Sequence, residues 1–169
     1  MSSSPLSCTV RRTESTTDLL AVLNGADPGF ESYLLASWSP GPPDQEDIVL
    51  PDLAALLDEP LALRKPRTGH TPSRLLTWHC SILSNGRAAL TDDQWFELTW
   101  KVLDATGIEP DDDPDACRWV ALRNTGDRLD LVATVIRQDG RWARLHNDQR
   151  WARFACEDFA RDHGLTARR

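Results

Sequence analysis

Residues 117–140 read CRWVALRNTGDRLDLVATVIRQDG and predict two β-strands joined by a short polar turn. The first run, residues 117–123, is rich in aromatic and β-branched side chains, and the second, residues 129–136, is almost continuously apolar. Between them, residues 124–127 (NTGD) have the composition of a hairpin turn. The stretch therefore predicts an antiparallel strand pair around which the rest of the chain is organised.

Side chains alternate between the two faces of a strand, so the second strand predicts one face that packs on helices and one polar face. The face expected to pack on helices carries Leu129, Leu131, Ala133 and Val135. Arg128, Asp130 and Val132 share the opposite face. We expect Arg128 and Asp130 to lie close to Asn124 on the neighbouring strand, which makes these three polar residues a candidate site.

The flanking sequence predicts four helices and one further buried strand. The strand is residues 75–84, and the helices are residues 18–24, residues 52–57, a helix ending near residue 106 and residues 148–163. Thr91 and Gln94 have the spacing of a capping box that opens the third helix, and Gly107 suits its end. Residues 1–17 are rich in Ser and Thr and are expected to be a disordered or weakly ordered segment, with a short strand at residues 8–10 as the alternative. Residues 18–169 are then expected to be the folded domain.

This order of elements predicts an α+β fold, in which an antiparallel sheet is flanked by helices on one face. A chain of 169 residues is the size of one domain, and its 40% hydrophobic content and seven Trp residues are enough for a core. No apolar run is long enough to span a membrane. The four cysteines form no CxxC pair and no signal peptide precedes them, so we expect reduced thiols and a cytoplasmic protein.

The formal net charge of −7 is unusual for a nucleic-acid-binding protein. Binding to DNA would require the basic residues to be grouped on one surface. Arg141, Arg144, Arg150 and Arg153 are close in sequence, near Trp142 and Trp151. They suit either a patch that stacks bases and binds phosphate or an ordinary solvated helix face with Trp151 in the core, and the negative net charge favours the second.

The predicted hairpin resembles the metal-site segment of relaxases, the DNA nickases of plasmid mobilisation in the His-hydrophobic-His superfamily. Their pattern is Arg-His, three residues, His, a hydrophobic residue, His, and then an apolar run ending in Val-Arg-x-Asp-Gly. Arg123 matches the arginine, Leu129 the central hydrophobic residue and residues 137–140 the ending. The three histidine positions carry Asn124, Arg128 and Asp130.

Other segments resemble actinobacterial relaxases in the same order along the chain. They are residues 36–38, 78–81, 90–95, 117–121, 132–140 and 164–165. The resemblance implies a central antiparallel sheet flanked by helices, in agreement with the order of elements. It also implies a nucleophilic tyrosine near the N-terminus that attacks a DNA phosphodiester. The family segment is similar to residues 19–25, but both tyrosine positions are replaced, by Val22 and Asn24, and Tyr33 is the only tyrosine.

The metal implied by the resemblance polarises the scissile phosphate. Asn124 and Asp130 offer oxygen ligands, but the fixed positive charge of Arg128 would repel a dication. We therefore expect Arg128 to pair with Asp130 or Asp127 in place of a metal. Alternatively, the Arg128 guanidinium binds a DNA phosphate through two hydrogen bonds. His79 is expected to be an internal hydrogen-bonding partner.

Three functions follow from these expectations. The first is a non-catalytic, single-stranded DNA-binding or accessory protein that needs no cofactor and has lost the nicking activity of the family. The second is a working nickase that uses Asp127 and Asp130 to bind Mn²⁺ or Mg²⁺ and Tyr33 or water as nucleophile. The third is an interaction protein without DNA, such as a homodimer that exchanges elements through a linker at residues 40–47. The DNA-binding candidates are Arg123, Arg128, Arg137, Arg141, Arg144 and Arg150.

Overall fold

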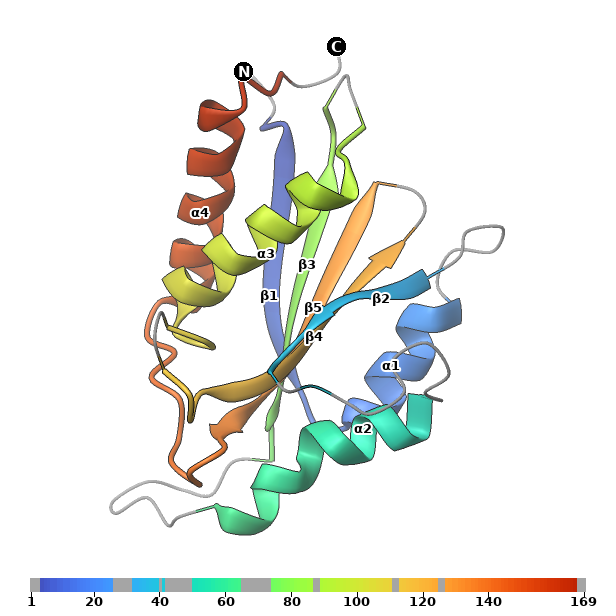
Figure 1. Cartoon of the computed structure of the whole chain (residues 1–169), viewed down its shortest axis with the longest axis vertical. Helices are drawn as coiled ribbons and strands as arrows, with labels where there is room; N and C mark the ends of the chain where they lie inside the picture. Colours follow the sequence, from blue (N-terminus) through green and yellow to red (C-terminus); the bar gives the residue numbers. More distant parts are fainter. Residues whose placement is uncertain are drawn as a thin grey trace.

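The computed structural model describes residues 4–25, 32–39, 41, 50–64, 74–86, 89–110, 113–124 and 127–166. The strands are β1 (Leu6–Thr13), β2 (Ser32–Ser37), β3 (Thr77–Ser84), β4 (Cys117–Asn124) and β5 (Arg128–Arg137). The helices are α1 (Thr16–Gly25), α2 (Leu50–Asp58), the 3-10 helix η1 (Glu59–Leu63), α3 (Asp92–Thr106) and α4 (Asp148–Asp162). The predicted α+β class is confirmed (Figure 1).

All five strands pair antiparallel in the order β1-β3-β5-β4-β2, so the predicted strand pair β4–β5 lies inside the sheet. Its bounds agree with the sequence prediction to within one residue at each end. Residues 125 and 126 of the expected hairpin turn lie outside the described residues. β2 was not predicted, and a register shift between Leu34 and Ala36 interrupts its pairing with β4.

Helices cover both faces of the sheet, so the expectation of helices on one face is wrong. On the α3/α4 face, the indole Nε1 of Trp78 donates to Asp148 of α4 at 3.1 Å. On the α1/α2 face, the Oγ1 atoms of Thr16 and Thr77 lie 2.7 Å apart, and Thr134 Oγ1 donates to the Leu57 carbonyl at 3.1 Å. Both faces need cover because every residue of β5 from Leu129 to Ile136 is buried. Beyond Asp130, the buried side chains on each face of this strand are apolar or, at Thr134, hydrogen-bonded to a helix.

The N-terminal stretch expected to be disordered is an edge strand from Leu6 onward, so residues 1–17 do not form a separate segment. β1 pairs with β3 along its whole length, from Leu6 opposite Ser84 to Thr13 opposite Thr77. Two outer backbone groups at its middle bond to the Gln149 side chain of α4, which accepts from Val10 N at 2.7 Å and donates to the Cys8 carbonyl at 3.1 Å. Covering an edge in this way blocks pairing with another chain.

The helix ends follow the sequence signals. Thr91 Oγ1 accepts from Gln94 N at 3.2 Å, the Gln94 side chain accepts from Thr91 N at 2.9 Å, and Gly107 ends α3 at a φ of 87°. The expectation that Trp151 lies in the core is wrong, because Trp151 is 47% exposed on α4, and Phe154 on the same helix is 49% exposed. The buried residues of α4 are Ala152, Ala155, Cys156, Phe159 and Ala160. Small side chains at four of these five positions let α4 pack closely on β1 and α3.

The largest fully buried side chains of the core are Trp78, Trp95 and Trp119. Gly140 lies just after β5 at a φ of 84°, and a Cβ atom there would collide with the Leu63 carbonyl of η1. None of the helices in the described ranges is long and apolar enough to cross a membrane. The predicted linker at residues 40–47 lies outside the described residues apart from Gly41.

Candidate functional site

The strand register gathers polar side chains on the α1/α2 face, beyond the part that the two helices cover. Arg11 of β1 lies directly opposite His79 of β3, and Ser81 of β3 lies between Thr9 and Asp130. We call this group the polar sheet patch. It consists of Thr9, Arg11, His79, Ser81, Arg128 and Asp130. The patch lies on the same face as Thr77 and Thr134, which α1 and α2 bury.

Asp130 is the centre of the patch. Its Oδ2 accepts from Arg128 Nε at 2.8 Å, and its Oδ1 lies 2.8 Å from His79 Nε2. A carboxylate is an acceptor only, so the His79 Nε2 atom is the donor. The side chains of Arg128, His79 and Asp130 are 19%, 13% and 4% exposed, so water screens the pairs only weakly. The Arg128–Asp130 pair and the hydrogen-bonded role of His79 were both predicted.

The residues at this place do not fit a divalent metal. Arg128 supplies donors and no acceptor, and its positive charge holds an oxygen of Asp130 that a metal would need. Asn124 is buried at the end of β4. Across the described part of the chain, no group of three His, Cys, Asp or Glu side chains is placed to hold a metal ion. Of the three positions to which the resemblance assigns histidine, Arg128 and Asp130 thus form an ion pair.

The tyrosine positions of the family also lack the expected chemistry. Val22 is 64% exposed on α1, and Asn24 is exposed near the end of the same helix. In the strand register, Tyr33 lies opposite Arg123 of β4 and Asp130 lies opposite Leu122. Because successive residues of β4 point to opposite faces, the side chains of Tyr33 and Asp130 lie on opposite faces of the sheet.

The phenol of Tyr33 is held in its protonated form. Its hydroxyl donates to Asp92 Oδ1 at 2.6 Å. Burial and this carboxylate raise the pKa of Tyr33, which disfavours the phenolate that would attack a phosphodiester. Tyr33 is therefore poorly suited to be the nucleophile of a remodelled nickase.

The six candidate DNA-binding arginines are dispersed. Arg128 lies in the polar sheet patch, whereas Arg123 is 8% exposed on the α3/α4 face, where it stacks over Trp95. Arg137 pairs with Asp113 at 2.6 Å and lies at the other end of β5, roughly 30 Å from Arg128 at the usual rise of a strand. The remaining three, Arg141, Arg144 and Arg150, are exposed on or before α4.

Arg11 is the residue that the sequence analysis missed. It is exposed, lies opposite His79 and forms no ion pair with the described residues. It was overlooked because it falls in the stretch expected to be disordered. The alternation of polar Thr9 and Arg11 with apolar Cys8 and Val10 is typical of a half-buried strand and could have placed Arg11 on the polar face.

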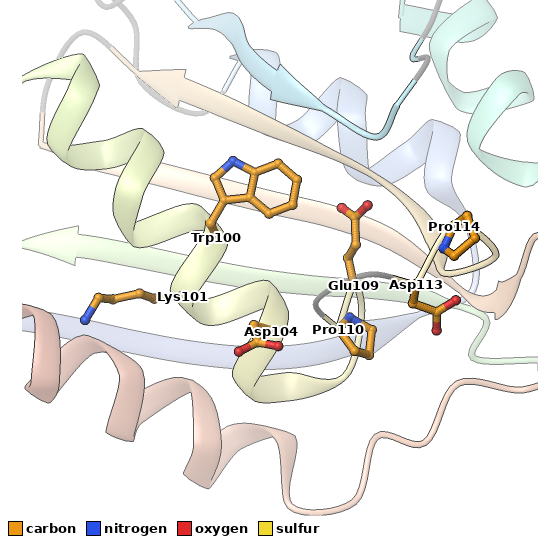
Figure 2. Close-up of a pocket in the computed structure, with 7 residues that line it drawn as sticks. All are labelled: Trp100, Lys101, Asp104, Glu109, Pro110, Asp113 and Pro114. Atoms are coloured by element: carbon orange, nitrogen blue, oxygen red, sulfur yellow. The ribbon is translucent and has the colours of Figure 1, made fainter.

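A hollow of about 640 Å³ lies far from the polar sheet patch, at the end of α3 (Figure 2). In Figure 2, the Glu109 carboxylate lies between Trp100 of α3 and the loop that carries Asp113. Glu109 accepts a hydrogen bond from Trp119 Nε1, and burial raises the pKa of this carboxyl group. Three carboxyl groups line this hollow, from Asp104, Glu109 and Asp113, so it does not suit a phosphate.

Comparisons with known protein families, with curated proteins and with solved structures found no match for this chain. The relaxase resemblance therefore stays a prediction that rests on the sequence motifs. The geometry of the site is independent of it.

Proposed function

We propose that this chain is a relaxase-derived protein that binds single-stranded DNA without cutting it and acts as an accessory factor in DNA mobilisation. The observation that carries the proposal is the Arg128–Asp130–His79 network. It lies where the resemblance assigns the metal, and both Asp130 oxygens are engaged at 2.8 Å. The fold class implied by the resemblance agrees with the observed sheet.

Two parts of the nicking reaction have no counterpart at the positions that the resemblance assigns to them. A metal would polarise the phosphate and stabilise the charge on the attacking and leaving oxygens. Arg128 occupies one of its ligand positions, and Val22 and Asn24 occupy the positions of the nucleophile. Without a metal site and a tyrosine beside it, binding is the activity that the surface supports.

The polar sheet patch offers groups that bind a phosphodiester backbone. Arg11 is exposed, the Arg128 side chain is 19% exposed, and Thr9 and Ser81 add hydroxyl groups on the same face. Arginine binds phosphate through charge-assisted hydrogen bonds. Because the net charge is −7, the attraction is local to this patch, and binding should weaken steeply as salt increases.

Fluorescence anisotropy of a labelled, mixed-sequence single-stranded oligonucleotide, titrated at several salt concentrations, tests the proposal. We expect binding at low salt in the presence of EDTA. Arg11→Ala and Arg128→Ala should each weaken it, and each lost phosphate contact should reduce the slope of log K against log salt by about 0.7. Arg161→Ala is the matched control, because Arg161 is an exposed arginine on α4 that pairs with Asp158.

Unchanged affinity in both patch variants would remove the role given to the patch. An equal loss in Arg161→Ala would show that the attraction is general rather than local. Circular dichroism of each variant separates lost contacts from lost folding.

A second function, self-association, is favoured by exposed aromatic residues on α3 and α4. The exposed side chains are Phe96, Trp100, Trp151 and Phe154, between 39% and 49% exposed. The rings of Trp151 and Phe154 lie 6.1 Å apart beside a hollow of about 450 Å³ between the two helices. Large exposed apolar side chains that gather on one surface are typical of protein interfaces.

Size-exclusion chromatography with light scattering tests self-association. A dimer that Trp151→Ser converts to a monomer would support an interface on these helices. A monomer at high protein concentration would exclude it, and would leave the DNA-binding proposal unaffected.

A further inference from the structure

Three cysteine thiols meet where β1, β3 and α4 come together on the α3/α4 face. The Sγ atoms of Cys8 and Cys80 lie 3.5 Å apart. Cys156, on α4, is a further neighbour of Cys8. Cys80 and Cys156 are buried, whereas Cys8 on the edge strand is partly exposed. A partly exposed cysteine thus lies beside two buried ones.

The surroundings of Cys8 favour its thiolate. Hydrogen bonds from Cys156 and Cys80, together with the positive charge of Arg153, lower the pKa of Cys8 despite its partial burial. The same contacts and burial raise the pKa of Cys80 and of Cys156, so those two keep their protons. Cys117 differs, because burial raises its pKa to about 12. Reactivity towards oxidants follows the accessible thiolate, which here is Cys8.

We propose that Cys8 is an oxidation site, which reacts with hydrogen peroxide and then forms a disulfide bond with Cys80. The Cys8 thiolate attacks one peroxide oxygen, the O–O bond breaks, and hydroxide leaves behind a sulfenic acid. The Cys80 thiol gives its proton to that hydroxide to form water. The Cys80 sulfur then attacks the Cys8 sulfur and expels the sulfenic oxygen as a second hydroxide. The two thiols lose two electrons, and the peroxide accepts them.

The two sulfurs are already close, but the two strands must shift for a bond to form. Cys8 lies opposite Ile82 and Cys80 opposite Val10, so the two cysteines are diagonal neighbours on adjacent antiparallel strands. Their sulfurs must approach by about 1.5 Å to reach the length of a disulfide bond. Diagonal neighbours are usually roughly 7 Å apart, against about 4 Å between the Cβ atoms of a disulfide, so the edge strand β1 must also shift relative to β3. The bond would link the edge strand β1 to β3 directly behind the polar sheet patch, whose Thr9 and His79 are the sequence neighbours of these cysteines.

The test treats the reduced, full-length protein with hydrogen peroxide at neutral pH, alkylates the remaining thiols after denaturation and maps the peptides by mass spectrometry. The untreated protein has four alkylatable thiols. We expect two after oxidation, Cys117 and Cys156, with a peptide that joins Cys8 to Cys80. Reduction with dithiothreitol should restore all of them. The oxidised form should melt about 5 °C or more above the reduced form.

Two variants make the assignment specific. Cys117→Ser is the matched control and should oxidise like the wild type, whereas Cys8→Ser should form no disulfide bond and consume peroxide at least ~10-fold more slowly. Cys8 is the partly exposed cysteine of the three, so its replacement by serine should disturb the fold less than replacement of Cys80 or Cys156. A Cys8–Cys156 peptide, alkylation of all four thiols after peroxide, or equal rates for Cys8 and Cys117 would each overturn the proposal.

Discussion

Replacing Asp130 with alanine should strongly destabilise the fold. The carboxylate is 4% exposed and accepts from both Arg128 and His79, which are themselves 19% and 13% exposed. Removing one member of a buried pair costs about 3–5 kcal/mol, because the other charge is left without its partner. Arg128 lies at the start of β5 and retains some contact with water, so we expect a value near the lower limit, about 3 kcal/mol.

Urea unfolding measures this loss. With a slope of about 1–3 kcal/mol per molar urea, a loss of about 3 kcal/mol lowers the midpoint by roughly 1–3 M. Asp158→Ala is the matched control, since Asp158 is 51% exposed and pairs with Arg161 on the surface of α4. The control should change the free energy of unfolding by less than about 1 kcal/mol. If both variants unfold at the same urea concentration, the network does not stabilise the sheet and our account of the site is wrong.

Three further substitutions test other parts of the structure by urea unfolding. Gly140→Ala should cost more than about 1 kcal/mol, because the residue has a φ of 84° and its new Cβ would meet the Leu63 carbonyl; a neutral result would contradict that close approach. Thr91→Ala should cost about 1 kcal/mol through loss of the capping box, and Thr91→Ser should restore most of it. Glu109→Gln should increase stability at neutral pH, since burial raises the pKa of Glu109 and so penalises its charged form. That gain should disappear as the pH falls below the pKa of an unfolded glutamate, where the wild-type side chain is also neutral; a gain that persists in acid would refute the cause given.

The fold was predictable where local chemistry decides the outcome. The capping box at Thr91, the glycine stop at Gly107 and the apolar runs of β4 and β5 depend on neighbours in sequence, and each was located to within about one residue. β1 and β2 were harder to predict, because an edge strand needs only a few apolar residues and depends on partners far along the chain. The pairing of β1 with β3 joins residues more than sixty positions apart.

The place of Trp151 on α4 was mispredicted because size, and not only hydrophobicity, decides which side of a helix packs. Trp151 and Phe154 are the most apolar residues near its start, yet the helix buries Ala152, Ala155 and Cys156 to approach β1. Sequence alternation correctly placed Arg128 and Asp130 on one face. It could not reveal that Arg11 joins them, because that contact depends on the register between β1 and β3.

The central claim, that DNA is bound at an ion-paired sheet surface without a metal, is tested most directly by comparing DNA affinity with and without metal. Anisotropy of the labelled single strand would be measured at one low salt concentration in EDTA and in Mn²⁺, for the wild type and for Arg128→Ala. We predict equal affinity in the two conditions for the wild type and weaker binding for the variant in both. Binding that appears only with Mn²⁺, or that is unchanged by Arg128→Ala, would contradict the account.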